Sequence, residues 1–241
     1  MEKVAELIPR AGSAYKNGWR VMSKNFITLF LVLLIIFVAS APLSVTFNIS
    51  DLKTHNYGII SDFMTDSYGI LAIAVIFVQI FGLAYTLFLI SPLKYGRKLV
   101  YLKAARDDKF EVSDMFDSFK NYLNVVLAAL LSGAIIVFGF FFLIIPGIVF
   151  ACRLVFVPYL VMDKKLDPVK AVEESWRLTK GHGWRILWMG IMAFFISIAG
   201  LIVLLFGVFI AGMWISAAFA SLYHAVLLEK DEYVVPNGNG N

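Results

Sequence analysis

The stretch "NYLNVVLAALLSGAIIVFGFFFLIIPGIVFACRLVFVPYLVM", residues 121–162, is 42 residues long and contains one charged side chain, Arg153. A straight helix of this length would measure about 60 Å, about twice the thickness of the hydrocarbon layer of a bilayer. The stretch must therefore fold back on itself as two membrane-spanning helices. Pro146-Gly147 lies near its middle and predicts the bend, because proline and glycine stop or loosen a helix.

Three more apolar blocks occupy residues 25–50, 69–93 and 186–228. The chain as a whole is 60% hydrophobic and 16% charged, whereas soluble domains average about 45–50% and about 25%. The last block is also too long for one span, and Phe206-Gly207 predicts its bend. Six spans follow, at about residues 26–48, 69–93, 122–145, 148–164, 185–205 and 208–228.

These spans predict an all-α integral membrane protein, with six transmembrane helices arranged as three hairpins. The fourth span is the shortest and needs the residues around Asp163 to reach full length. A cleaved signal peptide is the alternative for the first block, because Ala39-Ser40-Ala41 has the spacing of a cleavage site. Pro42 in the next position disfavours cleavage.

The basic residues are distributed asymmetrically along the chain. Of the 21 Lys and Arg residues, 19 fall on one side of the predicted membrane, one falls on the other side, and Arg153 lies within a span. The positive-inside rule then places both termini in the cytoplasm, in a multi-pass protein of the cell inner membrane. The net charge of +4 is explained by topology, and no nucleic-acid partner is expected. Residues 235–241, "VPNGNGN", are expected to form a disordered tail.

A short amphipathic segment precedes each predicted hairpin. The three segments end in similar tripeptides, Lys24-Asn25-Phe26, Lys120-Asn121-Tyr122 and Lys180-Gly181-His182, after which an apolar span begins. They predict three copies of a unit made of a short cytoplasmic amphipathic helix and a hairpin. Their aromatic and basic side chains are expected at headgroup depth; they are Trp19, Phe119, Trp176 and Lys180.

The segment from Ile145 to Arg185, "IPGIVFACRLVFVPYLVMDKKLDPVKAVEESWRLTKGHGWR", carries a resemblance. It resembles a bacterial and archaeal six-span membrane family that includes the membrane domain fused to some glycerophosphodiester phosphodiesterases. The shared pattern is a Pro-Gly turn, Arg153 in the following span, Pro158, Ser175-Trp176 and then Lys-Gly-His. The resemblance implies an all-helical six-span bundle and assigns no activity.

Catalysis is not expected from this sequence. No segment between spans exceeds about thirty residues, too few for an independent soluble catalytic domain. The apolar blocks contain no Asp or Glu, the three histidines are far apart, and Cys152 is the single cysteine. Intramembrane acid–base chemistry, ion-coupled pumping and metal or cofactor binding are therefore all disfavoured.

Arg153 is the candidate functional residue. Helical rise places it about 9 Å from the predicted outer turn, within reach of the phosphate layer. Two interpretations remain open: Arg153 is a structural residue that snorkels or caps freed carbonyls, or it binds a lipid phosphate in a pocket between spans. The polar residues that are candidates for lining such a pocket are Gln79, Tyr159, Ser197 and His224.

Span six also carries a stripe of small residues, Gly212, Ser216 and Ala220, that allows another helix to approach closely. Taken together, the sequence predicts a non-enzymatic inner-membrane protein, either an accessory or scaffold subunit of a membrane complex or a lipid-organising protein. Membrane lipids are the expected partners, with other membrane-protein subunits as further candidates. The alternative is a small-molecule transporter or a lipid-translocating protein.

Overall fold

The computed structural model describes residues 10–54, 66–202 and 204–234, and within these ranges the chain is helical and contains no strand. Five helical segments are long and apolar enough to cross a membrane. The number is six if the pair formed by α1 (Ala11–Lys24) and α2 (Phe26–Thr54), bent by 95°, is counted as one span. The prediction of an all-α, multi-pass membrane protein is confirmed. The predicted tail, residues 235–241, lies outside the described residues.

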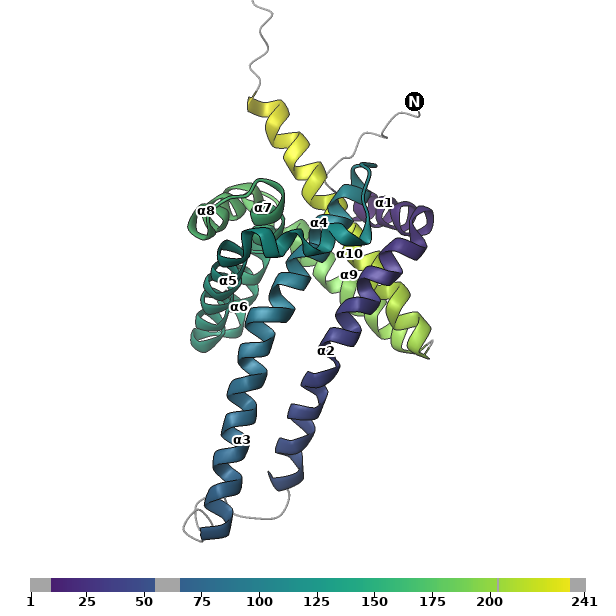
Figure 1. Cartoon of the computed structure of the whole chain (residues 1–241). Coiled ribbons are helices and arrows are strands. Elements are labelled where there is room, and N and C mark those ends of the chain that lie inside the picture. The colour runs from purple at the N-terminus through teal and green to yellow at the C-terminus, as the bar shows by residue number, and fades with distance from the viewer. Residues whose placement is uncertain (1–9, 55–65, 203, 235–241) are drawn as a thin grey trace, which may run out of the picture.

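The remaining elements follow the apolar blocks of the sequence. They are α3 (Asp66–Tyr85), the π-helical turn η2 (Thr86–Ile90), α4 (Ser91–Ala105), the 3-10 segment η3 (Val112–Asn121), α5 (Tyr122–Phe142), α6 (Ile144–Arg153), α7 (Val157–Asp163), α8 (Pro168–Thr179), α9 (Gly183–Ile202) and α10 (Leu204–Val234). Helices α5 and α6 pack together, as do α9 and α10, while α2 and α3 reach further down than either pair in Figure 1.

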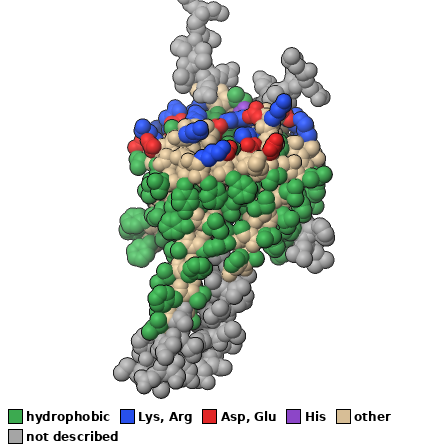
Figure 2. All heavy atoms as spheres, viewed as in Figure 1, with side chains coloured by type: hydrophobic (Ala, Val, Ile, Leu, Met, Phe, Trp, Pro, Cys, Tyr) green, Lys and Arg blue, Asp and Glu red, His purple; other side chains and the backbone are tan. Residues whose placement is uncertain are grey.

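Charged and apolar side chains separate along the long axis of the molecule. Figure 2 shows Lys, Arg, Asp and Glu gathered in a band at one end, with a belt of apolar side chains directly below it. Helices α1, α4, α7 and α8 lie at the level of this band in the same view (Figure 1). The belt is the surface that a bilayer covers, because apolar side chains exposed in such number require an apolar solvent.

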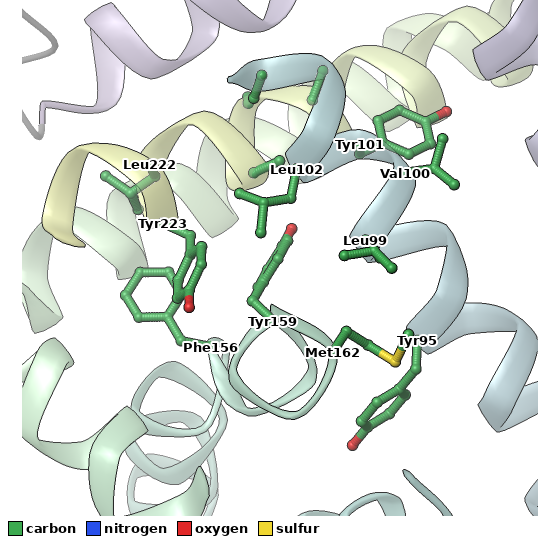
Figure 3. Packing of buried hydrophobic residues seen from close by; sticks show 14 of the residues in the cluster. Tyr95, Leu99, Val100, Tyr101, Leu102, Phe156, Tyr159, Met162, Leu222 and Tyr223 are labelled. Atoms are coloured by element: carbon green, nitrogen blue, oxygen red, sulfur yellow. The ribbon is translucent and has the colours of Figure 1, made fainter. Parts of the chain in front are cut away.

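The buried core lies at the charged end. Ten residues of α4 are buried, so this helix is enclosed by its neighbours on most sides. Tyr159 of α7 stacks on Tyr223 of α10 with ring centroids 5.0 Å apart, and Phe156 packs against Tyr223 at 5.4 Å. Figure 3 shows these rings meeting between α7 and α10, beside Leu102 of α4. Tertiary packing is therefore concentrated at the membrane boundary.

The helices break at the repeated tripeptides. Asn25, between α1 and α2, has φ −120° and ψ 31°, and Asn121, between η3 and α5, has φ −119° and ψ 41°. In the third copy Gly181 has φ +89°, in the left-handed region that glycine adopts without steric cost. A polar residue or a glycine thus ends each amphipathic segment at the same place in the pattern.

Both predicted bends are displaced by a few residues. The first turn lies at Leu143, and Pro146 falls in the first turn of α6, where its missing N–H has no helical acceptor to lose. At the second, α9 ends at Ile202 and α10 begins at Leu204, so residues 206 and 207 are already helical. It is Gly200 that permits close packing of α9 and α10, since a Cβ on Gly200 would lie 2.7 Å from the carbonyl oxygen of Gly207.

The spans also differ from their predicted limits. The second span continues past residue 93, because η2 and α4 extend the helix to Ala105. Pro92 does not end it: the carbonyl of Phe88, four residues earlier, accepts a hydrogen bond of 2.9 Å from the hydroxyl of Tyr122. The fourth span, predicted as residues 148–164, is split into α6 and α7 at residues 154–156.

Candidate functional site

Arg153 is the last residue of α6, where the chain turns toward α7. Helix α8 lies against this end of α6, and the hydroxyl of Ser175 donates a hydrogen bond of 2.7 Å to the Arg153 carbonyl. The hydroxyl of Thr179 lies 3.5 Å from the same oxygen. The backbone of Arg153 is therefore fixed by α8, because a carbonyl at a helix end needs a donor from outside the helix.

The guanidinium group of Arg153 lies over the indole of Trp176, with 5.6 Å between its carbon and the ring centroid. Its Nη1 atom is buried and has no hydrogen-bond partner. Among the described residues, no Asp or Glu forms an ion pair with Arg153. A half-buried cation held by an aromatic face, with one donor unused, is suited to bind an anion.

An apolar groove of about 510 Å³ adjoins Arg153. It runs between α6 and the start of α9, and it is lined by Ile145, Ile148, Val149, Cys152, Arg153, Gly183, Trp184 and Leu187. Trp184 is 77% exposed, which places an indole at the edge of the groove with most of its surface free. The site thus has a cationic group at one end and an apolar groove beside it, which match the anionic headgroup and the acyl chains of a phospholipid.

The position of Arg153 differs from the sequence prediction in one respect. We expected it to reach the phosphate layer near the outer turn. In the structure Arg153 is the tenth residue of α6, at the end of the helix that is far from the turn at Leu143. Its guanidinium faces α8, which lies at the level of the charged band (Figures 1 and 2). Arg153 therefore lies toward the charged band, where α6 ends and meets α8.

The four polar residues proposed to line a pocket with Arg153 lie apart. Tyr159 lines a cavity with Arg97 and Lys98, and Gln79 lines an apolar groove of about 930 Å³ between α3 and α5. Ser197 is exposed on α9, where its hydroxyl donates to the carbonyl of Ala193. His224 is half-buried in α10 with its Nδ1 unpartnered.

The residues of the small-residue stripe of α10 have different surroundings. A Cβ on Gly212 would lie 3.6 Å from Leu33 of α2, Ser216 lines the cavity of Arg97 and Lys98, and Ala220 is fully buried. The close approach of α1 to α10 uses other residues: a Cβ on Gly18 of α1 would lie 2.7 Å from the backbone nitrogen of Ala218. The small residues of α10 thus bring α1 close within the same chain.

The residues predicted at headgroup depth keep exposed side chains. Trp19 on α1 is 50% exposed, while Phe119, Trp176 and Lys180 are also exposed. Trp19 packs edge-on against Trp214 of α10 at 5.2 Å. Glu174 on α8 is held by Arg177, whose hydrogen bonds keep the pKa of this carboxyl below its usual value.

Sequence reasoning missed two residues, Arg97 and Lys98, which it counted only as topology signals. The structure places both against a cavity in the core. The signal was available in the sequence, because Lys98 and Tyr101 lie three residues apart on one helix face and directly follow an apolar span. The described residues contain no group of His, Cys, Asp and Glu that could hold a metal ion.

Comparisons of this chain with protein-family models, curated proteins and solved structures gave no match.

Proposed function

We propose that this chain is a non-enzymatic protein of the inner membrane that organises anionic phospholipids in the cytoplasmic leaflet. In this proposal three hairpins cross the bilayer, both termini are cytoplasmic, and the amphipathic segments around Trp19, Phe119 and Trp176 lie in the interface. The observation that carries the proposal is Arg153, whose guanidinium has an unused buried donor beside an apolar groove. A lipid phosphate satisfies the donor while an acyl chain occupies the groove.

The surroundings of Arg153 support a lipid more strongly than a polar solute. The grooves at Arg153 and at Gln79 are lined mainly by apolar side chains, whereas a transporter of polar molecules requires polar groups reaching the bilayer midplane. The Lys and Arg side chains of the charged band, which also contains Asp and Glu (Figure 2), attract the negative charge of the cytoplasmic leaflet. A role as an accessory subunit in a larger complex is compatible with the same lipid site.

The first prediction concerns the lipids that accompany the purified protein. We expect the wild-type chain, extracted in mild detergent, to retain phosphatidylglycerol in preference to phosphatidylethanolamine when it is examined by native mass spectrometry. Arg153→Gln removes the charge and should reduce this retention about tenfold, because a charge-assisted hydrogen bond contributes about 1.5–3 kcal/mol. The fold should be unaffected, since the interhelical bonds at this position use the Arg153 carbonyl.

Lys170→Gln is the matched control. Lys170 lies on α8, its side chain is 70% exposed, and its Nζ lies 3.7 Å from Asp167 at the surface. The substitution removes one positive charge from the same region without touching the groove, so lipid retention should stay at the wild-type level. Equal lipid content in wild type and Arg153→Gln would refute the lipid site, and transfer of a labelled lipid between leaflets of reconstituted vesicles would favour translocation instead.

A further inference from the structure

A second group of cations lies inside the core. Arg97 and Lys98 of α4 reach a cavity of about 150 Å³ between α4, α7 and α10. Its other lining residues are Tyr101, Tyr159, Ile215, Ser216 and Phe219. The volume is roughly ten times the minimum that one water molecule requires. The cavity shares no lining residue with the groove at Arg153, so the two sites can be tested separately.

The charges in this cavity are not neutralised by the protein. The Nε atom of Arg97 is buried without a hydrogen-bond partner, and the Nζ atom of Lys98 lies 4.7 Å from the centroid of the Tyr159 ring. In the part of the chain that the structure describes, neither residue forms an ion pair with Asp or Glu. Two adjacent cations in a protected site repel one another, and a bound anion relieves this cost.

Two other cations of the same region have acidic partners, unlike Arg97 and Lys98. Lys103 and Arg106 lie further along α4 and at its end, and each has a carboxylate partner: Asp114 lies 3.0 Å from Lys103, and Asp163 lies 2.6 Å from Arg106. Both pairs are also partly buried. Of Arg97, Lys98, Lys103 and Arg106, the fold thus supplies acids for the last two and leaves an open cavity beside the first two.

The side chains that line the cavity indicate the kind of ligand that it would bind. An arginine presents a planar set of donors that fits two oxygens of one group, and a lysine adds a mobile point charge. The hydroxyl of Ser216, which donates 2.7 Å to the Gly212 carbonyl, adds a polar atom to the wall. We propose that this cavity binds a phosphate group. The group is either the headgroup phosphate of a membrane lipid or free inorganic phosphate, since both present several oxygens and negative charge to the same donors.

The test is a titration of the full-length protein in nanodiscs of phosphatidylcholine. Inorganic phosphate is added at constant ionic strength with chloride as the exchanged ion, and binding is measured by isothermal titration calorimetry. In parallel, nanodiscs containing phosphatidic acid are used, and the lipid that remains bound after detergent exchange is identified by native mass spectrometry. Saturable phosphate binding indicates the free anion, whereas selective retention of phosphatidic acid without phosphate binding indicates the lipid; either outcome supports the site.

Four variants locate the binding. Lys98→Met and Arg97→Gln each remove one cation from the cavity and should weaken binding at least about tenfold. Lys170→Gln removes an exposed cation of α8 that does not line the cavity and should leave binding unchanged. Ser216→Val changes the wall without removing a charge and should also weaken binding, which tests the cavity if a charge variant does not fold.

Two outcomes would overturn the proposal. One is wild-type protein that binds neither inorganic phosphate nor phosphatidic acid. The other is an equal loss in Lys170→Gln and Lys98→Met, which would mean that the overall surface charge binds the anion. The result is separable from the function proposed for Arg153, because Arg153→Gln should leave binding in this cavity intact, whichever way its own test turns out.

Discussion

Gly96→Ala should destabilise the protein by about 3 kcal/mol, at the upper end of the range for overpacked sites. A Cβ on Gly96 of α4 would lie 1.7 Å from the carbonyl oxygen of Met115 in η3. The clashing atom belongs to the backbone, so no change of rotamer can relieve the overlap, and η3 must move away from α4. We expect the thermal unfolding midpoint in detergent to fall by roughly 6–12 °C, the shift expected for this loss in a chain of this size.

Gly133→Ala is the matched control for this experiment. Gly133 lies within α5, and a Cβ built on it meets no other atom within 4 Å. Alanine in a helix interior is more stable than glycine by about 0.5–1 kcal/mol, so the midpoint should stay constant or rise. A Gly96→Ala protein as stable as Gly133→Ala would show that η3 does not pack on α4 as described.

The second large effect is expected at Asp163, the last residue of α7. Its carboxylate accepts hydrogen bonds of 2.6 and 2.7 Å from the two terminal nitrogens of Arg106 and one of 3.2 Å from the hydroxyl of Tyr223. These bonds join α7 to the end of α4 and to α10. Hydrogen bonding to Asp163 also raises the pKa of Arg106 above its ordinary value, so the guanidinium stays charged.

Asp163→Ala leaves a partly buried guanidinium without its counter-ion. Removing one partner of a buried pair costs about 3–5 kcal/mol. The side chains of Arg106 and Asp163 are 25% and 15% exposed, so we expect the lower part of that range, about 3 kcal/mol. The free energy of unfolding can be measured by titration with denaturant in mixed micelles.

Asp167→Ala provides the comparison four residues away. Asp167 is 64% exposed and its contact with Lys170 is 3.7 Å long, so its loss should change stability by less than about 1 kcal/mol. If both substitutions have equal effects, the Arg106–Asp163 pair does not hold the three helices together. A double substitution, Arg106→Met with Asp163→Leu, should recover much of the loss, because apolar residues of similar size remove the unpaired charge.

The sequence alone was sufficient to predict a lipid environment for the chain and to count its apolar blocks. Both follow from composition and segment length, because each helix must satisfy its own backbone hydrogen bonds in lipid and needs about 20 apolar residues to cross. The repeated tripeptides also located the breaks at Asn25, Asn121 and Gly181, because Asn and Gly leave the α conformation at lower cost than most residues. Such features depend on neighbouring residues in the chain and are therefore readable from one sequence.

The tertiary structure decided the features that depend on partners distant in the chain. Pro92 reads as a helix stop, yet the helix continues because Tyr122 supplies the hydrogen bond that Phe88 would lose. The glycine at position 207 predicts a turn, but in the structure the carbonyl oxygen of Gly207 lies against Gly200. The tight fit of Gly96 on Met115 has no local signature at all, since it arises where α4 meets η3.

The same distinction applies to the cations. In the sequence, Arg97, Lys98, Lys103 and Arg106 are four equivalent basic residues after an apolar span. Only the packing of α4 against η3, α7 and α10 gives carboxylates to two of them and leaves the other two facing a cavity. Charge count is a property of composition, whereas the neutralisation of a charge depends on which groups lie within a few ångströms, and that distance is set by the fold.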